Sequence, residues 1–351
     1  MPGRVTGVAL SFRRAYRMES DMRIIVYGIG AIGGTIAAAL ALAGQEVIGI
    51  ARGPQLNAIR ANGLLLRTPG NSARARFACV SDPSEIEFRP DDAILLTMKS
   101  QDTVAALERL RVASVCEQPV FCVQNGVANE RFALRRFPNV HGATVILPAN
   151  FMVPGEVTAF GSPRHGIFDI GRYPEGSNDH DERLATSLRC ANIAAFISND
   201  VMQSKYGKLL MNLNNIVEAA LGPGSPDGCI AQLLREEAEV VFKAAGIAWR
   251  EVGAADPRRA ELMRPQRISG VARSGNSSAQ SLARGSGSIE TDYLNGEIVL
   301  LGRLHGIPVP ANAFFVELSA RMVRENVKPG TISAAQMKAL LSDRGVVIKP
   351  R

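Results

Sequence analysis

The chain has 351 residues, of which 46% are hydrophobic and 21% charged, a composition that is ordinary for a globular protein and excludes a disordered or collagen-like chain. Its length leaves room for two domains. The formal net charge of +7 does not predict a nucleic-acid partner, because the basic residues are scattered and their short clusters lack aromatic neighbours. Only seven of the 40 basic residues are Lys. Since Lys, unlike Arg, can lose its proton when buried, each Lys is a candidate acid or base.

Cysteine and histidine spacing bears on redox and metal chemistry. The five Cys form no Cys-x-x-Cys pair, and the four His never fall at His-x-x-x-His spacing. We therefore expect neither a disulfide framework nor a metal site, and we expect a cytoplasmic protein, where thiols stay reduced.

Residues 1–21 differ from the sequence that follows. They lack the uninterrupted apolar run and the small-residue cleavage site of a secretory signal. We interpret them as a disordered leader or as the product of an upstream start codon, with an organellar transit peptide as the alternative.

The run from Ile24 to Gln45 carries no charge, and its length alone would suit a transmembrane helix. Its internal pattern favours a βαβ unit instead. A β-branched and aromatic strand over 24–27 ends at a glycine cluster, an Ala/Leu-rich helix spans 31–43, and a second strand spans 47–50. We therefore expect no membrane association.

Strand-like and helix-like segments continue to alternate up to about residue 197, with apolar runs at 93–98, 120–123 and 143–147. After residue 200 the apolar period becomes helical, and we expect helices over 202–221, 228–245, 255–263, 277–284, 289–305 and 311–324. The predicted fold is α/β, with an N-terminal Rossmann-type doubly wound parallel sheet followed by an all-helical C-terminal domain. The expected boundaries are a leader at 1–21, a nucleotide-binding domain at 22–199, a helical substrate domain at 200–330 and a tail at 331–351.

A glycine-rich turn stands between the first strand and the first helix, which is the context that a dinucleotide fingerprint requires. In such a turn the glycines allow a tight bend, close approach of backbone to a pyrophosphate, and close helix–strand packing. The predicted cofactor-binding residues here are Gly28, Ile29, Gly30, Ala31, Ile32 and Gly33.

The end of the second strand predicts which nucleotide binds. An NAD site places an acid there, whereas this chain has Arg52, which can bind a 2′-phosphate. We therefore expect NADP(H). Lys99 and Asn125 directly follow two later strands, at the sheet edge where ligands bind in such folds. Lys99 is a candidate for the cofactor phosphates or ribose, and Asn125 is either a site residue or a simple turn residue.

Lys205, Lys208 and Asn212 share one face of a predicted helix. A Lys and an amide one turn apart could serve carbonyl reduction, with the ammonium as proton donor. A solvated Lys–Asn face is the alternative on spacing alone.

Further motifs follow the same order as those of a known family. Taken with the residues above, they give the stretch 22–325 a sequence that resembles the ketopantoate reductase (2-dehydropantoate 2-reductase) family. Gly275 departs from it, because some members have Asn at this place. The matching motifs are Gln124-Asn125-Gly126, Lys208-Leu209-Leu210-Met211-Asn212, Asn276-Ser277-Ser278, the stretch that begins at Glu290, and His305-Gly306-Ile307-Pro308.

The resemblance implies NADPH-dependent reduction of 2-dehydropantoate to pantoate, on the route to pantothenate and coenzyme A. It implies that Lys208 is the general acid, with Asn212 and Asn125 as polar partners at the reacting centre. It also implies that Glu290 binds a substrate hydroxyl or Lys208, and that Ser278 holds the carboxylate. We expect burial to lower the pKa of Lys208 and Glu290 to oppose that shift.

Three alternatives stay open. One is a related reductase of another 2-oxo acid, the second is a β-hydroxyacid dehydrogenase, and the third is an NADPH-binding sensor without turnover. The predicted partner is a small 2-oxo acid. The sequence is compatible with a homodimer and does not determine the oligomeric state.

Overall fold

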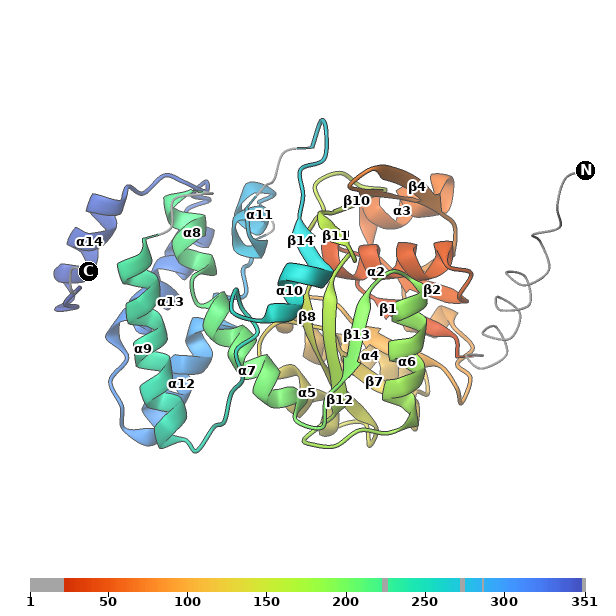
Figure 1. The fold of residues 1–351 in the computed structure, drawn as a ribbon, viewed down its shortest axis with the longest axis horizontal. Coiled ribbons are helices and arrows are strands. Elements are labelled where there is room, and N and C mark those ends of the chain that lie inside the picture. Colours follow the sequence, from red (N-terminus) through yellow and green to blue (C-terminus); the bar gives the residue numbers. More distant parts are fainter. Residues whose placement is uncertain (1–21, 223–226, 272–274, 286, 349–351) are drawn as a thin grey trace, which may run out of the picture.

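The computed structural model describes residues 22–222, 227–271, 275–285 and 287–348. The predicted leader at 1–21 lies outside these residues. The larger part of the chain before residue 200 forms an α/β unit, and most of the chain after it forms helices (Figure 1). This α/β architecture confirms the predicted fold class.

The central sheet has eight strands in the order β13-β12-β8-β7-β6-β1-β2-β5. All neighbours run parallel except β12 and β8, which are antiparallel. The order reverses between β1 and β6, which is where a doubly wound sheet opens a crevice at its carboxyl edge. The strands are β1 (Ile24–Tyr27), β2 (Val47–Ile50), β5 (Ala78–Val80), β6 (Ala93–Leu96), β7 (Val120–Cys122), β8 (Val140–Ile146), β12 (Ile167–Arg172) and β13 (Ala194–Ile197).

Two smaller sheets flank the central one. The first has the order β4-β3-β10-β9, with β3 (Leu64–Thr68), β4 (Asn71–Ala75), β9 (Ala149–Asn150) and β10 (Glu156–Ala159). The second pairs β11 (Gly161–Pro163) with β14 (Met263–Pro265). Because β14 comes from the second half of the chain, the expectation of an all-helical C-terminal part is wrong in this segment: its backbone is paired with a strand of the first half.

The uncharged helix α2 (Ala31–Leu42) lies between the central sheet and the first small sheet. Its residues 33–40 are all buried, and they pack with Ile24 and Val26 of the central sheet on one side and Leu64 and Val157 on the other. A helix that is apolar all round must be buried on all sides. The two sheets supply that burial, which explains a hydrophobic run long enough to suggest a membrane span.

Other helices complete the two faces of the central sheet. α3 (Gly53–Asn62) and α6 (Asp179–Cys190) pack on the same face as α2, and α4 (Thr103–Val112) and α5 (Asn129–Leu134) cover the opposite face. α6 lies after the last of the apolar runs that the sequence indicates before residue 197, and no expected segment corresponds to it. Its start carries a capping box. The Asn178 side chain accepts from the backbone N–H of Asp181, and the Asp181 side chain accepts from the backbone N–H of Asn178.

The helical part packs around its own core. Its helices are α7 (Val201–Asn212), α8 (Asn215–Leu221), α9 (Gly228–Ala244), α10 (Pro257–Leu262), α11 (Ser277–Ala283), α12 (Asn295–His305), α13 (Pro310–Arg324) and α14 (Ala334–Ser342). The single helix expected over 202–221 is two helices, broken after Asn212. The segment expected as a tail contains α14, whose Met337 and Leu341 are buried in this helical core.

A buried ion pair fixes the first strand of the described chain to its neighbour. The Arg23 guanidinium donates to both carboxylate oxygens of Asp92, at 2.7 and 2.6 Å, and to the carbonyl of Glu87. The Asp92 carboxylate also accepts from the backbone N–H of Arg89. Both side chains of the pair are buried. The pair therefore aligns the amino ends of β1 and β6, the two strands whose carboxyl ends flank the glycine turn.

We expect Asp92→Ala to lower the free energy of unfolding by about 3–5 kcal/mol, because it leaves the Arg23 charge buried without its partner. The measurement is urea unfolding followed by circular dichroism. The matched control is the adjacent Asp91→Ala, which should change stability by less than about 0.5 kcal/mol. Equal stability of the two variants would contradict the role given to the pair.

Candidate active site

A cavity of about 1090 Å³ opens at the carboxyl edge of the central sheet. The glycine turn and the ends of β1, β6, β7 and β8 form one side, and α7, α8, α10 and α11 form the other. It brings together most of the residues that the sequence singles out. The predicted residues that line it are Gly28, Ile29, Gly30, Ala31, Ile32, Arg52, Lys99, Asn125, Lys208, Asn212 and Glu290.

The glycine turn has the shape that a dinucleotide phosphate needs. Gly28 has φ +106°, a conformation that side chains rarely adopt, and a Cβ there would lie 2.8 Å from the backbone nitrogen of Met98. A Cβ on Gly30 would meet only open space on the cavity side, so the backbone is bare where a ligand would approach. Gly30 caps α2, whose first turn carries no acidic residue. A phosphate is therefore favoured at this helix N-terminus.

Gly33 does not line the cavity. Its Cβ would lie 2.3 Å from both the Gly28 carbonyl oxygen and the Thr97 Oγ1. Its role is the third one expected of the fingerprint, the close packing of helix against strand.

Arg52 stands at the rim of the cavity, at the N-cap of α3. Its side chain is exposed, and the structure gives it no carboxylate partner among the described residues. Arg109 of α4 also lines the cavity, but it is paired with Asp82 at 2.8 Å. A guanidinium at the end of β2 fits an anionic group on the ribose better than it fits a ribose diol.

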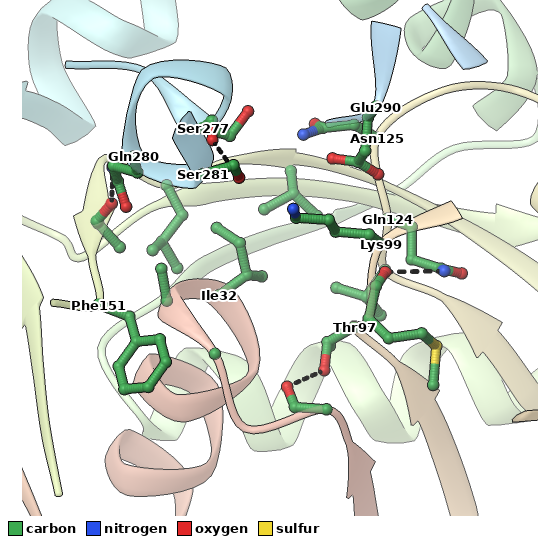
Figure 2. A pocket seen from close by; sticks show the side chains of 18 of the residues that line it. Ile32, Thr97, Lys99, Gln124, Asn125, Phe151, Ser277, Gln280, Ser281 and Glu290 are labelled. Carbon is green, nitrogen blue, oxygen red and sulfur yellow. Dashed lines mark hydrogen bonds between the residues drawn. The ribbon is translucent and has the colours of Figure 1, made fainter. Parts of the chain in front are cut away.

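Lys99 and Glu290 lie near each other on one side of the cavity, with Asn125 beside Glu290 (Figure 2). The Glu290 carboxylate accepts from the backbone N–H and the hydroxyl of Ser100, at 3.0 and 3.2 Å. Lys99 donates to the Ser288 carbonyl at 2.7 Å. Burial raises the pKa of Glu290 and lowers that of Lys99. These bonds join the loop after β6 to the segment before α12.

Lys208 projects from α7 into the cavity, where its Nζ donates to the Val145 carbonyl at 2.7 Å. Removal from water, together with the positive charges of Arg259 and Lys205, lowers its pKa to about 7. The expected opposition by Glu290 is not found, because Glu290 is bonded to Ser100 and its cationic neighbour is Lys99. Near neutral pH, Lys208 can therefore both give and take a proton.

Lys205, one turn earlier, has a different environment. Its Nζ lies 2.5 Å from the Glu130 carboxylate and donates to the carbonyls of Cys122 and Gln124. The side chain is 2% exposed and does not line the cavity. The geometry thus gives Lys205 a structural contact and leaves Lys208 as the lysine that α7 presents to a ligand.

Asn212 lies one turn after Lys208 on the same helix face. Its side chain is buried, and its Nδ2 has no hydrogen-bond partner in the described part of the chain. A buried donor without an acceptor costs about 1–3 kcal/mol. Because Asn212 lines the cavity, a ligand oxygen can supply the acceptor.

Ser278 does not line the cavity, and this differs from the role that the resemblance implied. Asn276 caps α11 by accepting from the backbone of Ser278 and Ala279. That start turns Ser278 into the protein, where it is buried. Ser277 and Ser281 are the hydroxyl-bearing residues of α11 that face the cavity, and Figure 2 shows them together.

Several further residues line the cavity that the sequence did not single out. Arg259 comes from the short helix α10, and Gln280 of α11 donates to the Asn150 side chain at 2.9 Å. Met211 and Asn215 flank Asn212. The spacing of Asn215 and Met211 on α7 and α8 follows the helix period, which could have indicated them. No local signal indicates Arg259, because its position depends on the pairing of β14 with β11.

Two kinds of feature are absent from the described residues. No helix in them is long and apolar enough to cross a membrane. Within the same residues, no group of three or more His, Cys, Asp or Glu could hold a metal ion.

Comparison with known proteins gives matches along most of the chain. The profile of the family described as ketopantoate reductase PanE/ApbA matches residues 24–175, and the profile of its C-terminal region matches residues 200–323. The 2-dehydropantoate 2-reductase of Pyrococcus horikoshii is 29% identical over 296 residues, which cover 83% of this chain and 94% of that protein. The enzyme of the same name from Caulobacter vibrioides is 29% identical over 314 residues, covering 84% and 97%.

Solved structures agree with this result. A PanE/ApbA family ketopantoate reductase from Ralstonia eutropha JMP134 is 31% identical, with a TM-score of 0.72 over 87% of this chain and 99% of that one. A D-mandelate dehydrogenase structure with NADH and anilino(oxo)acetate has a TM-score of 0.71 over the same shares at 23% identity, which indicates a shared fold. The two profiles and the Ralstonia structure show that this chain belongs to the ketopantoate reductase family.

Proposed function

We propose that this protein reduces 2-dehydropantoate to (R)-pantoate with NADPH, a step toward pantothenate and coenzyme A. The observation that carries the proposal is Lys208, a proton donor with a pKa of about 7 that shares one cavity with the glycine turn. The names of the relatives from Pyrococcus horikoshii and Caulobacter vibrioides support the choice of substrate.

The residues of the cavity divide the chemistry between them. NADPH, when bound, supplies a hydride to the carbonyl carbon. The Lys208 ammonium gives a proton to the carbonyl oxygen, and its bond to the Val145 carbonyl holds it in position. The unpartnered Asn212 amide donates to the same oxygen or to the neighbouring carboxylate. After transfer Lys208 is neutral, which its burial and the nearby charge of Arg259 favour.

The opposite side of the cavity suits the rest of the substrate. Glu290 and Asn125 lie together there, and a carboxylate that already accepts two bonds from Ser100 still has an oxygen free to accept from a hydroxyl. We propose that the terminal hydroxyl of the substrate binds at this place. Ser277 and Ser281 replace Ser278 as the hydroxyls near the ligand.

Arg52, Lys99 and the turn from Gly28 to Ile32 are the proposed cofactor contacts. The fold alone does not select the nucleotide, because the D-mandelate dehydrogenase neighbour is described with NADH. Arg52 at the end of β2 favours a 2′-phosphate, and we therefore propose NADP(H).

The cellular setting and the partners remain predictions. All five Cys are free thiols, which supports a reducing cytoplasm. We expect no nucleic-acid partner, and light scattering in solution would show whether a homodimer forms.

NADPH oxidation measured with 2-dehydropantoate and with a panel of other 2-oxo acids tests the function directly. We expect the highest kcat/KM with 2-dehydropantoate. A clear preference for another 2-oxo acid would favour the related-reductase alternative. Oxidation of a 3-hydroxy acid with NADP+, measured in the reverse direction, would favour the β-hydroxyacid dehydrogenases, and NADPH binding without turnover would favour the sensor.

We expect Lys208→Ala to lower kcat by about 10²–10⁴-fold, the usual effect of removing a positioned proton donor. NADPH binding, measured by fluorescence, should stay within about threefold of the wild type. Lys243→Ala, which removes an exposed Lys of α9, is the matched control and should keep full activity. Lys208→Ala with activity within threefold of wild type would rule out the assignment.

Reduction should slow as the pH rises through the pKa of Lys208. Below about 7 the ammonium is present and can donate, and above it the protonated fraction falls tenfold per pH unit. With NADPH saturating, the plot of log kcat/KM against pH should therefore break near 7. The break in log kcat should lie at higher pH, because the bound substrate carboxylate stabilises the ammonium. The residual activity of Lys208→Ala should lack this fall at high pH, which we call the Lys208 limb. A fall that persists in the variant would show that another group titrates there.

We expect Arg52→Ala to weaken NADPH binding by about 1.5–3 kcal/mol, the contribution of hydrogen bonds to a charged group, and to leave NADH binding nearly unchanged. The dissociation constants of both nucleotides give the result. Arg76→Ala, at another exposed position away from this cavity, is the control. An unchanged NADPH/NADH preference in Arg52→Ala would show that another residue selects the nucleotide.

A further inference from the structure

Arg259 is held at the junction of the two halves of the chain by its neighbour. Arg258 donates to both oxygens of Asp169 on β12, at 2.6 and 3.1 Å, and also to Asp256. Its guanidinium stacks over the Phe196 ring. These contacts fix α10 against the central sheet (Figure 1), while Arg259, the next residue, lines the cavity.

The same part of the sheet holds Lys208. Asp169 pairs with Thr144 across the β12–β8 ladder, and the next residue, Val145, gives the carbonyl to which Lys208 donates. Asp169, which binds Arg258, and Val145, which binds Lys208, thus lie at adjacent positions of the β12–β8 ladder. Arg259 and Lys208 therefore approach the cavity from two elements that meet at this point. The positive charge of Arg259 lowers the pKa of Lys208.

Arg259 differs from the other arginines of this region because it forms no ion pair with any described residue. Arg258 and Arg250 are paired with Asp169, and Arg235 with Glu239 and Glu251. Arg259 is only partly buried and has no carboxylate partner among the described residues. Of the acidic residues that line the cavity, Glu290 is engaged by Ser100 near Lys99, and neither Asp102 nor Glu218 pairs with Arg259. Asp256 is close enough for the charge of Arg259 to lower its pKa, but its carboxylate is bonded to Arg258. Two like charges therefore stand together at this end, and no carboxylate of the described residues forms an ion pair with either of them.

A 2-oxo acid has the groups that this arrangement lacks, since its carboxylate is bonded directly to the carbonyl carbon. We propose that Arg259 binds the substrate carboxylate while Lys208 faces the adjacent carbonyl oxygen, so that Arg259 makes the enzyme selective for 2-oxo acids over ketones and esters. This inference rests on the proposed reduction of a 2-oxo acid. A guanidinium suits the task because it can bind both carboxylate oxygens at once.

The test compares a 2-oxo acid with its methyl ester, which has the same carbonyl but no charge. The variant Arg259→Gln should lower kcat/KM for the acid by roughly 10- to 150-fold, mainly through KM, as expected for loss of a hydrogen bond to a charged group. With the ester, at a pH below the pKa of Lys208, it should change little. The acid-to-ester ratio should therefore fall by the same factor. Arg259→Lys should recover part of the acid-to-ester ratio, because the positive charge remains but the guanidinium that can bind two carboxylate oxygens is lost.

A second readout is the pH profile with the ester. Removal of the Arg259 charge should move the Lys208 limb to higher pH, because one of the two neighbouring cations that disfavour the ammonium is gone and Lys205 remains paired with Glu130. A residue with a purely structural role would move neither this limb nor the acid-to-ester ratio. The affinity for NADPH and the melting temperature should stay at wild-type values in Arg259→Gln.

Arg264→Gln is the matched control. Arg264 is exposed on the same segment and does not line the cavity, so its replacement should leave the acid-to-ester ratio unchanged. If Arg259→Gln behaves like this control while the wild type reduces 2-oxo acids, the role of Arg259 is refuted and the proposed function stands. If the wild type reduces no 2-oxo acid, the proposed function itself fails, and the inference fails with it.

Discussion

A lysine ammonium is stable away from water only where carboxylates or carbonyl oxygens replace its hydration, and α7 carries two lysines that meet this constraint differently. Lys205 has the Glu130 carboxylate and two carbonyls, so it stays in the interior as part of the fold. Lys208 has one carbonyl and two cations nearby, so its proton is held weakly. The difference is set by what each lysine faces, because α5 offers the Glu130 carboxylate to Lys205 and the open cavity lies next to Lys208.

The sheet and the glycine turn place the cofactor side of the site against this helix. α2 is buried between two sheets, so the turn that precedes it has little freedom to move. The Arg23–Asp92 pair aligns the strands on either side of that turn. The precision of the site therefore comes from packing that is remote from it, as is usual for binding residues presented by a rigid scaffold.

Much of this could be predicted from the sequence, because it depends on local signals. The glycine turn between strand and helix, Arg52 at a strand end, and the Lys208–Asn212 spacing are each legible within a few residues. What could not be predicted depends on contacts between distant segments. The sequence alone does not show whether Ser278 or Ser281 faces the ligand. The start of α11 at its cap, Asn276, decides this. Whether Lys205 shares the role of Lys208 could not be predicted without knowing where Glu130 lies, and the place of Arg259 follows from a strand pairing across about 100 residues.

The β11–β14 ribbon has a mechanical consequence. It joins the two halves of the chain through backbone hydrogen bonds at the substrate end of the cavity, beside the Arg258–Asp169 contact. At the other end the halves meet through side-chain bonds, from Lys99 to Ser288 and from Ser100 to Glu290. Side-chain contacts exchange more readily than a paired backbone. Separation of the halves at the Lys99–Glu290 end would therefore break only hydrogen bonds that involve a side chain, whereas separation at the ribbon would break paired backbone.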